Sequence, residues 1–518
     1  MSRINKWFLP LLLFLAVGAA YANSLSSGFV WDDSPLIIGK QDFFSHPGNA
    51  LALLASPDAA LGARKAPPYY RPLDTLSYML DHYLWGLHPF WYHAENVLLH
   101  ALVVLLFYLL LMEVFKGRRL AFIASVLFAV YPVNAEAVDA IFNRNVILCA
   151  FFSLVCLICI KKGGLKWTVL SFLAYFLALL SKEPAVVLPF FLLSFSLTSR
   201  EKRFKASWKA LAGFFGITAV YFVIRRLVLG AFIAKHGMGF SLSRLELISS
   251  VYYEHFRLFV FPFKLNALYT PAAVSFSAFK AAAAIAGVLL LLYLSLGKKT
   301  PGPVRAGAQW IFWGLLPVSN IVKIPSAPVA ERFQYTIIFG FVLILAYLLA
   351  GLQKKKTLTG AAAVSVLVLA LGARTVKRNL IWRDDVSLYA SMIRSDPSDA
   401  TAYYNLGNVY GKSGGLGDAV LEFRTALAMD PGYVKARLNL GVAYAKEGLL
   451  PDAVRQFMRA AAMCPSMPEA HLYLGVAYAK EGLPGLAERQ FQTVLKLDPG
   501  NVQALEYMDR TKGLMGGR

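Results

Sequence analysis

The segment ENVLLHALVVLLFYLLLMEVF, residues 95–115, is a long apolar run, and the basic cluster KGRR follows it at 116–119. About 17–25 apolar residues in a helix are enough to cross the hydrocarbon core of a bilayer. Cytoplasmic loops carry an excess of Lys and Arg, so the cluster also indicates which end of the helix faces the cytoplasm. The segment therefore predicts a transmembrane helix whose C-terminal end lies at the cytoplasmic face.

The composition of the whole chain also indicates a membrane protein. Of the 518 residues, 57% are hydrophobic and 16% are charged, whereas soluble domains have about 45–50% apolar and about 25% charged residues. We expect an all-α polytopic domain at 1–373 with about eleven spans. The first run resembles a secretory signal peptide, but many spans follow it, so we interpret it as a retained helix. The expected spans lie near 6–22, 95–115, 119–135, 145–160, 167–181, 184–198, 208–229, 279–297, 306–322, 333–352 and 357–373.

The net charge of +22 is concentrated in the membrane part of the chain. There 34 Lys and Arg stand against 15 Asp and Glu, while the chain from Arg374 onward has 18 against 15. The basic residues cluster in short connections, which is typical of cytoplasmic loops and does not indicate nucleic-acid binding. An apolar segment at 246–263 contains four ionisable residues. We interpret it as an interfacial helix, because only then do all the basic clusters lie on one side.

An odd number of spans fixes the expected topology. The N-terminus is then cytoplasmic, residues 23–94 form a long outer loop, and the chain after 373 lies outside. We expect an integral membrane protein, in the inner membrane of a bacterium, with its C-terminal domain on the extracytoplasmic side.

The C-terminal part consists of repeated blocks of 34 residues. Seven positions recur in each block, and all but one keep their residue type: Leu406, Gly407, Tyr410, Ala419, Phe423, Ala426 and Pro431, then Leu440 to Pro465, then Leu474 to Pro499. The pattern resembles the tetratricopeptide repeat. We expect a connecting helix at 374–399, repeats at 400–433, 434–467 and 468–501, and a capping helix. Such an α-solenoid presents a concave surface for an extended peptide or a partner helix, and it serves equally well as a docking clamp with no substrate role.

An acidic pair follows the first apolar run, in the stretch GFVWDDSP at 28–35. On the expected topology Asp32 and Asp33 lie near the outer membrane surface, where reduced hydration shifts carboxylate pKa values. Adjacent residues point to different sides in a helix or strand, so the two acids should do different jobs. We predict that Asp32 is a general base and that Asp33 orients it, or binds the acceptor or a helix N-terminus. The structural alternative is that Asp33 or Ser34, ahead of Pro35, caps a helix.

Further ionisable residues recur at the outer ends of the predicted spans. Charges at such depth are costly, so they suggest function. A carboxylate beside several cations suits sugar transfer from a polyprenyl phosphate: the base activates an acceptor hydroxyl, and the cations stabilise the departing phosphate. The donor's lipid tail stays in the bilayer, so the enzyme must span it. The cations expected on this side are Arg144, Lys182, Arg225, Arg226 and Arg332.

The order of these motifs resembles the transmembrane and tetratricopeptide-repeat protein O-mannosyltransferase family, which has the GT-C fold. The motifs are WDD at 31–33, YYRPLDTLSYMLDHYLWGLHPFWYHAENVLLH at 69–100, YPVNAEAV at 131–138, NRNV at 143–146, LLSKEPAVVLP at 179–189, AERFQY at 330–335 and the terminal repeats. The resemblance implies inverting transfer of one sugar, mannose or another hexose, from a polyprenyl-phosphate carrier to an acceptor hydroxyl. A protein Ser or Thr is the favoured acceptor, and a glycan or a lipid is the alternative acceptor.

The resemblance also implies roles for single residues. Asp32 and Asp33 would be the catalytic pair. Arg144, Lys182 and Arg332 would bind the donor phosphate. Neither a cofactor nor a metal is implied. The residues expected to support the site are Arg71, His93, Asn96, Glu183 and Glu331.

Other interpretations of the sequence remain. His93 and His100 share a helix face, but a metal site needs further ligands, and structural hydrogen bonding is favoured. The chain is alternatively a non-enzymatic membrane scaffold that recruits partners through its repeats. A third possibility is a transporter or ligase of lipid-linked glycans, which would handle whole glycans instead of one sugar.

Overall fold

The computed structural model describes the chain except residues 1–6, 56–68, 199–206, 231–240, 271–273, 323, 325–326, 356 and 517–518. It divides into two units, Met1–Asp384 and Asp385–Arg518. In the described part of the chain both units are helical, and the one strand pairing is an isolated bridge between Tyr269 and Val329. The prediction of an all-α protein is confirmed.

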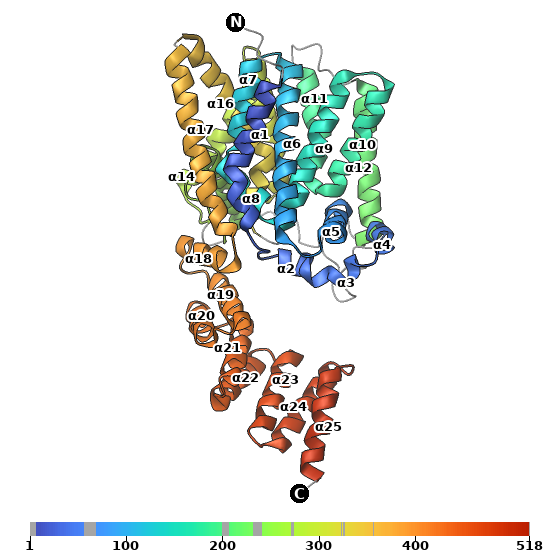
Figure 1. Cartoon of the computed structure of the whole chain (residues 1–518), viewed down its shortest axis with the longest axis vertical. Coiled ribbons are helices and arrows are strands. Elements are labelled where there is room, and N and C mark those ends of the chain that lie inside the picture. The colour runs from blue at the N-terminus through green and yellow to red at the C-terminus, as the bar shows by residue number, and fades with distance from the viewer. Residues whose placement is uncertain are drawn as a thin grey trace. The chain divides into compact units, whose positions relative to one another are not determined.

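The first unit is a helix bundle, with helices α2 to α5 gathered at one end (Figure 1). The helices of the bundle are α1 (Phe8–Tyr21), α6 (Pro89–Phe115), α7 (Arg118–Ala129), α8 (Ala135–Asp139), α9 (Arg144–Lys162), α10 (Leu165–Ser181), α11 (Leu188–Thr198), α12 (Trp208–Leu229), α13 (Leu242–Val260), α14 (Ala278–Leu296), α15 (Gly302–Leu315), α16 (Gln334–Lys355) and α17 (Thr357–Asn379). The helices at the end are α2 (Asp33–Leu36), α3 (Gln41–Phe44), α4 (Asn49–Ala55) and α5 (Pro72–Trp85).

The number of membrane spans differs from the prediction. In the described part of the chain, seven helical segments are long and apolar enough to cross a membrane, and an eighth results if the bent pair Arg118–Ala129 and Pro132–Asp139 counts as one span. The expected eleven spans are therefore corrected to seven or eight. Leu165–Ser181 and Glu183–Thr198 are apolar but shorter, and α15 has only 14 residues, whereas a full span needs about 20. The protein is an integral membrane protein with this smaller set of candidate spans.

The core of the bundle lies between α6, α7 and α16, where aromatic rings pack on one another. Phe128 is fully buried, and its ring centroid lies 4.5 Å from that of Phe339 and 5.3 Å from that of Tyr335. Phe107 of α6 completes the group, 4.7 Å from Phe339. Packing of this kind fixes the helices that carry the polar residues described below.

Contacts between connections define the two ends of the bundle. At one end, Arg305 donates to the carbonyl oxygens of Thr198 at 2.7 Å and Gly297 at 2.8 Å, so two basic connections meet there. At the opposite end, Asn379 of α17 donates to the carbonyl oxygen of Ala20 at 2.8 Å. Helices α2 to α5 lie at this second end (Figure 1). The polar residues of the candidate site are gathered there.

The second unit consists of α18 (Asp385–Ser395), three helix pairs and a final helix α25 (Val502–Gly516). The segment 374–399, expected to be one connecting helix, is divided between the end of α17, a short 3-10 helix Leu380–Trp382 and α18. The pairs are α19 (Ala400–Ser413) with α20 (Leu416–Met429), α21 (Val434–Lys446) with α22 (Leu450–Met463), and α23 (Pro468–Lys480) with α24 (Pro484–Leu497).

A glycine and a phenylalanine set the spacing within each pair. A Cβ atom added to Gly441 would lie 2.6 Å from the ring of Phe457, and Gly407 and Gly475 meet Phe423 and Phe491 in the same way. The repeated glycine is therefore required because the ring of the second helix occupies the space of a side chain.

We expect Gly441→Ala to destabilise the second pair by about 1–3 kcal/mol, because the added methyl group forces the Phe457 ring to move. Hydrogen exchange of α21 and α22 in the full chain measures this. Gly485→Ala is the control, since no atom lies within 4 Å of its added Cβ. Equal exchange in the two variants would show that the pair accommodates the methyl group.

Candidate active site

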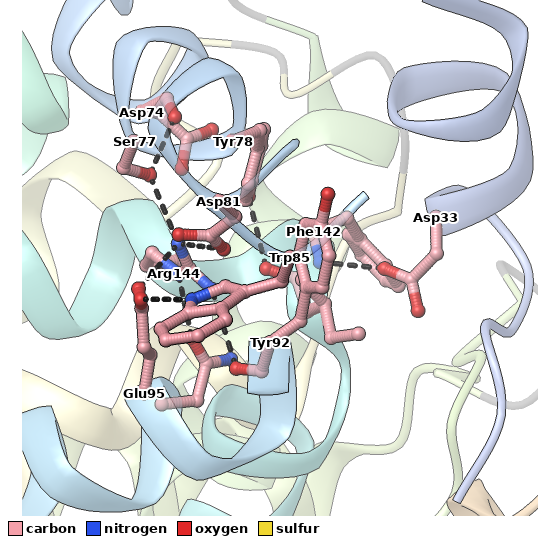
Figure 2. Close-up of polar contacts among 12 residues, drawn as sticks. Asp33, Asp74, Ser77, Tyr78, Asp81, Trp85, Tyr92, Glu95, Phe142 and Arg144 are labelled. Carbon is pink, nitrogen blue, oxygen red and sulfur yellow. Dashed lines mark hydrogen bonds and ion pairs between the residues drawn. The ribbon is translucent and has the colours of Figure 1, made fainter. Parts of the chain in front are cut away.

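Asp33 is fully buried and holds the first outer segment in place. Its Oδ2 accepts a hydrogen bond from the Val30 amide at 3.0 Å. Its Oδ1 accepts one from the Phe142 amide at 2.7 Å, which Figure 2 shows. Phe142 belongs to the 3-10 helix Ile141–Asn143, which precedes α9. A buried carboxylate with two backbone donors is firmly fixed. Asp33 therefore ties the acidic segment to the membrane bundle.

Asp32 has a different environment from its neighbour. It is exposed, and among the described residues none donates a hydrogen bond to its carboxylate. Loss of hydration raises the pKa of Asp32, and the positive charge of Arg332 lowers it. Helix α2 begins at Asp33, and Asp32 at its N-cap makes no side-chain capping bond. Neither Asp33 nor Ser34 therefore caps this helix.

Two residues of α6 support the same region. His93 is fully buried, and its Nε2 lies 3.2 Å from the carbonyl oxygen of Gly28, to which it donates. Asn96 donates to the carbonyl oxygen of Val138 at 3.1 Å, and its Oδ1 accepts from Arg144 Nε at 2.7 Å. The helix thus fixes both the start of the acidic segment and the guanidinium of Arg144.

Arg144 is fully buried, and all three of its side-chain nitrogens have acceptors (Figure 2). Its Nη1 lies 2.6 Å from Asp81 Oδ2 and 3.4 Å from Glu95 Oε2, and its Nη2 donates to the Tyr92 carbonyl oxygen at 3.2 Å. The Asp81 carboxylate is also fully buried, which raises its pKa, whereas the adjacent guanidinium lowers it. Arg144 therefore joins α5, α6 and α9 in one buried polar group.

We expect Arg144→Gln to cost about 3–5 kcal/mol of unfolding free energy, because it leaves the Asp81 carboxylate buried without its cation. Thermal unfolding in lipid nanodiscs measures this. The double variant Arg144→Gln with Asp81→Asn should recover part of the loss. Native stability combined with lost donor binding would instead favour direct contact between Arg144 and the donor phosphate.

A second set of cations lies around Lys182, between α10 and the 3-10 helix Glu183–Val187. Glu183 pairs with Arg71 at 2.8 Å and with Arg225 at 3.1 Å. Lys182 is itself buried, and in the described part of the chain its Nζ has neither a hydrogen-bond acceptor nor a carboxylate within 4.0 Å. Burial, and then the charges of Arg71 and Arg332, lower the pKa of Lys182 to about 7. Lys182 is therefore a cation without an anionic partner of its own.

Arg332 connects this set to the acidic pair. Its guanidinium pairs with Glu136, whose other oxygen accepts from the Arg332 amide at 2.8 Å. Its charge acts on both Asp32 and Lys182. Of the four cations in this set, Arg71 and Arg225 pair with Glu183 and Arg332 pairs with Glu136, whereas Lys182 pairs with neither carboxylate. Arg226, also expected on this side, is exposed and donates to the Gly230 carbonyl oxygen of its own helix end.

Glu331, next to Arg332 in the chain, lies in a separate buried pair. Both of its oxygens accept from Arg378 Nη2, at 2.9 and 3.0 Å, and both side chains are fully buried. The pair connects the start of the α16 segment to the end of α17. No group of three or more His, Cys, Asp or Glu residues is arranged to hold a metal ion among the residues that the structure describes.

Comparisons with known proteins give a match for the membrane unit and a separate match for the repeats. Residues 92–224 match the family described as dolichyl-phosphate-mannose-protein mannosyltransferase, and 404–468 and 451–502 match the tetratricopeptide repeat. A protein O-mannosyl-transferase of Caenorhabditis elegans is 28% identical over 436 residues, which cover 79% of this chain and 61% of that protein. Human protein O-mannosyl-transferase TMTC1 is 27% identical over 79% of this chain and 54% of its own length.

The membrane unit and the repeats are together similar to protein O-mannosyltransferases that carry tetratricopeptide repeats. Among solved structures, the crystal structure of MamA protein matches this chain with 21% sequence identity and a TM-score of 0.24. The match covers 25% of this chain and 72% of the MamA chain. The chain spans about half to three-fifths of the length of the curated O-mannosyltransferases that it matches first. Arg144 and Lys182 lie inside the matched mannosyltransferase region, and the acidic pair precedes it.

The sequence did not single out several ionisable residues that the structure places in buried ion pairs. Asp81 and Glu136 pair with Arg144 and Arg332, and Arg378 pairs with Glu331. A signal was present for Asp81 and Glu136, because each lies in one of the motifs at 69–100 and 131–138 that carry the family resemblance. No local signal indicated their partners, which lie between 47 and 196 residues away in sequence.

Proposed function

We propose that this protein transfers a single sugar, mannose or another hexose, from a polyprenyl-phosphate carrier to an acceptor hydroxyl. The observation that carries the proposal is the arrangement at one end of the membrane bundle: the exposed carboxylate of Asp32, the cation Lys182 without an anionic partner, and Arg332 acting on both. The proposed base, Asp32, and the proposed phosphate-binding cations, Lys182 and Arg332, therefore belong to one region. Similarity to protein O-mannosyltransferases supports the same chemistry.

The proposed reaction is a single displacement at the anomeric carbon. Asp32 accepts the proton of the acceptor hydroxyl as its oxygen forms the glycosidic bond. The bond between the anomeric carbon and the phosphate oxygen breaks, and its electron pair leaves with the polyprenyl phosphate. The leaving group gains one negative charge, which Lys182 and Arg332 stabilise. Attack from the opposite face inverts the configuration.

The surrounding residues hold these groups in place. Asp33 and His93 fix the backbone on either side of Asp32. Arg71 and Glu183 flank Lys182 and restrict its position. We assign Arg144 a positioning role instead of the phosphate contact that the family resemblance implies, because its nitrogens already have buried acceptors. Asn96 and Glu331 belong to the same supporting framework.

The wider assignments follow from the family. The favoured acceptor is a Ser or Thr hydroxyl of a protein, held by the repeats, and the reaction is expected on the extracytoplasmic face of the membrane. The family resemblance implies no metal. The positive charge at the phosphate would come from Lys182 and Arg332.

Reconstitution with defined substrates tests the function. The purified chain in lipid nanodiscs is incubated with a polyprenyl-phosphate mannose and a mixture of unfolded Ser- and Thr-containing proteins, and the products are analysed by intact mass and peptide mass spectrometry. We expect increments of one hexose on Ser or Thr. Attachment of a larger glycan would favour the alternative that the protein is a glycan ligase. Transfer of a lipid-linked glycan across the bilayer would favour the alternative that it is a transporter. No sugar on any acceptor would favour the scaffold.

A further inference from the structure

Trp31, the residue before Asp32, has an unusual backbone conformation. Its φ is +51°, in the left-handed region that bulky residues rarely adopt. Such a conformation persists only where the surroundings hold it, and it occurs often at functional sites. The backbone that carries Asp32 is therefore held in place by contacts of Trp31 and its neighbours.

The indole of Trp31 contacts two aromatic rings. It is stacked with Trp382, with the ring centroids 6.5 Å apart and the ring planes at 14°. It also makes an edge contact with Phe142, with the centroids 6.0 Å apart and the planes at 70°. Phe142 is also the residue whose amide binds Asp33. The Gly28 amide donates to the carbonyl oxygen of Arg383 at 2.9 Å, next to Trp382. The acidic segment is thus attached to 382–383 at its first residue, Gly28, and at Trp31.

Trp382 is itself rigidly placed. It is fully buried and ends the short 3-10 helix Leu380–Trp382 that continues α17. Asn379, directly before this helix, donates to the Ala20 carbonyl oxygen at 2.8 Å and to Asn23 Oδ1 at 2.9 Å. Asn23 in turn donates to the Val376 carbonyl oxygen at 2.9 Å. These bonds join the end of α17 to the end of α1, so Trp382 is a fixed surface for Trp31.

We infer that Trp382 is a positioning residue for Asp32: its indole holds Trp31 in the left-handed conformation and thereby sets the direction of the Asp32 carboxylate. The expected effect on catalysis rests on the proposed function. The expected effect on the backbone of the acidic segment rests only on the contacts of Trp31. Trp382 touches no reacting atom in this assignment. It also lies three residues before Asp385, where the repeat-bearing unit begins, so the segment that connects the two units is part of the support of the acidic segment.

Three variants of the full chain test the inference. Trp382→Leu removes the stacked ring, Trp382→Phe keeps an aromatic surface, and Trp313→Leu is the matched control. The Trp313 indole is likewise stacked, on Phe190 at 5.3 Å, but its hydrogen bond is to Ser194 of α11. Each variant is examined by hydrogen exchange of the peptide covering 28–36 and by steady-state transfer from polyprenyl-phosphate mannose.

We expect Trp382→Leu to accelerate exchange in 28–36 and to lower kcat by roughly 100-fold, the effect of a misplaced catalytic group, with an unchanged KM for the donor. Trp382→Phe should restore most of kcat, and Trp313→Leu should leave exchange in 28–36 as in the native chain. A merely structural role would instead change exchange throughout the bundle and lower both kinetic constants or the yield, without rescue by phenylalanine.

The exchange measurement separates this inference from the proposed function, because it needs no activity. Native exchange in 28–36 of Trp382→Leu overturns the inference whatever the chain catalyses. Faster exchange with native kcat also overturns it, because the backbone would then be released without consequence for Asp32. If the native chain transfers no sugar, the proposed function fails and the inference fails as a statement about catalysis, while exchange still reports whether Trp382 holds the segment.

Discussion

Asp32→Asn is expected to reduce sugar transfer by about 10²–10⁴-fold, the usual contribution of a general base. The amide keeps the size of the carboxylate but does not accept the proton of the acceptor hydroxyl. Folding should be unaffected, because Asp32 is exposed and its carboxylate accepts no hydrogen bond from the described residues. Initial rates with saturating donor and acceptor measure the effect, with thermal unfolding recorded on the same samples. The loss should appear in kcat.

Asp33→Asn is the matched control for this prediction. The Asp33 carboxylate is buried and accepts from two amides, and an asparagine in its place presents one acceptor and two donors. We expect Asp33→Asn to lower the unfolding temperature, whereas Asp32→Asn should not. A native transfer rate in Asp32→Asn would exclude Asp32 as the base and locate the base elsewhere.

The sequence predicted those features that depend on local patterns. The repeats were recognised because the residue types at Gly441 and Phe457 recur with a period of 34 residues, and the glycine and the phenylalanine of each repeat touch across its two helices. The all-helical fold followed from long apolar runs. The number of spans did not, because an apolar run does not show whether its helix is long enough: Pro132 breaks one run, and the helix at Leu165–Ser181 is short.

The candidate site depends on contacts that no local pattern encodes. The motif WDD showed two adjacent acids, but the amide that binds Asp33 is 109 residues away. Arg144 was expected at the donor phosphate because the family resemblance implies that contact. The fold surrounds it with Asp81, Glu95 and Asn96 from α5 and α6. Charged residues at membrane depth therefore indicate a polar region. Only the packing of the helices decides which of these charges are paired within the protein and which can bind a substrate.

Lys182→Gln is expected to lower transfer by about 10²–10³-fold, as for the loss of one donor to a developing negative charge. Lys182 carries the positive charge without a carboxylate of its own, so the donor phosphate would be its partner. Its pKa in the folded chain, about 7, is below the ordinary 10.5. The folded state therefore disfavours the cation, and neutral glutamine should leave stability near neutral pH equal to that of the native chain or higher.

The same pKa predicts a pH dependence with a definite sign. Transfer needs Asp32 deprotonated and Lys182 protonated, so kcat/KM, which reports the free enzyme, should fall as the pH rises through about 7. Lys182→Arg keeps the cation at higher pH, and its profile should lose this alkaline decline while retaining measurable transfer.

Lys40→Gln is the matched control for this profile. Lys40 is also buried, and burial lowers its pKa too, but the charge that acts on it is that of Asp74. We expect its variant to retain the alkaline decline. An unchanged decline in Lys182→Arg would assign the titration to another group. The phosphate would then be bound by Arg332 and Arg71 alone, because these two cations keep their charge throughout the range in which Lys182 loses its own.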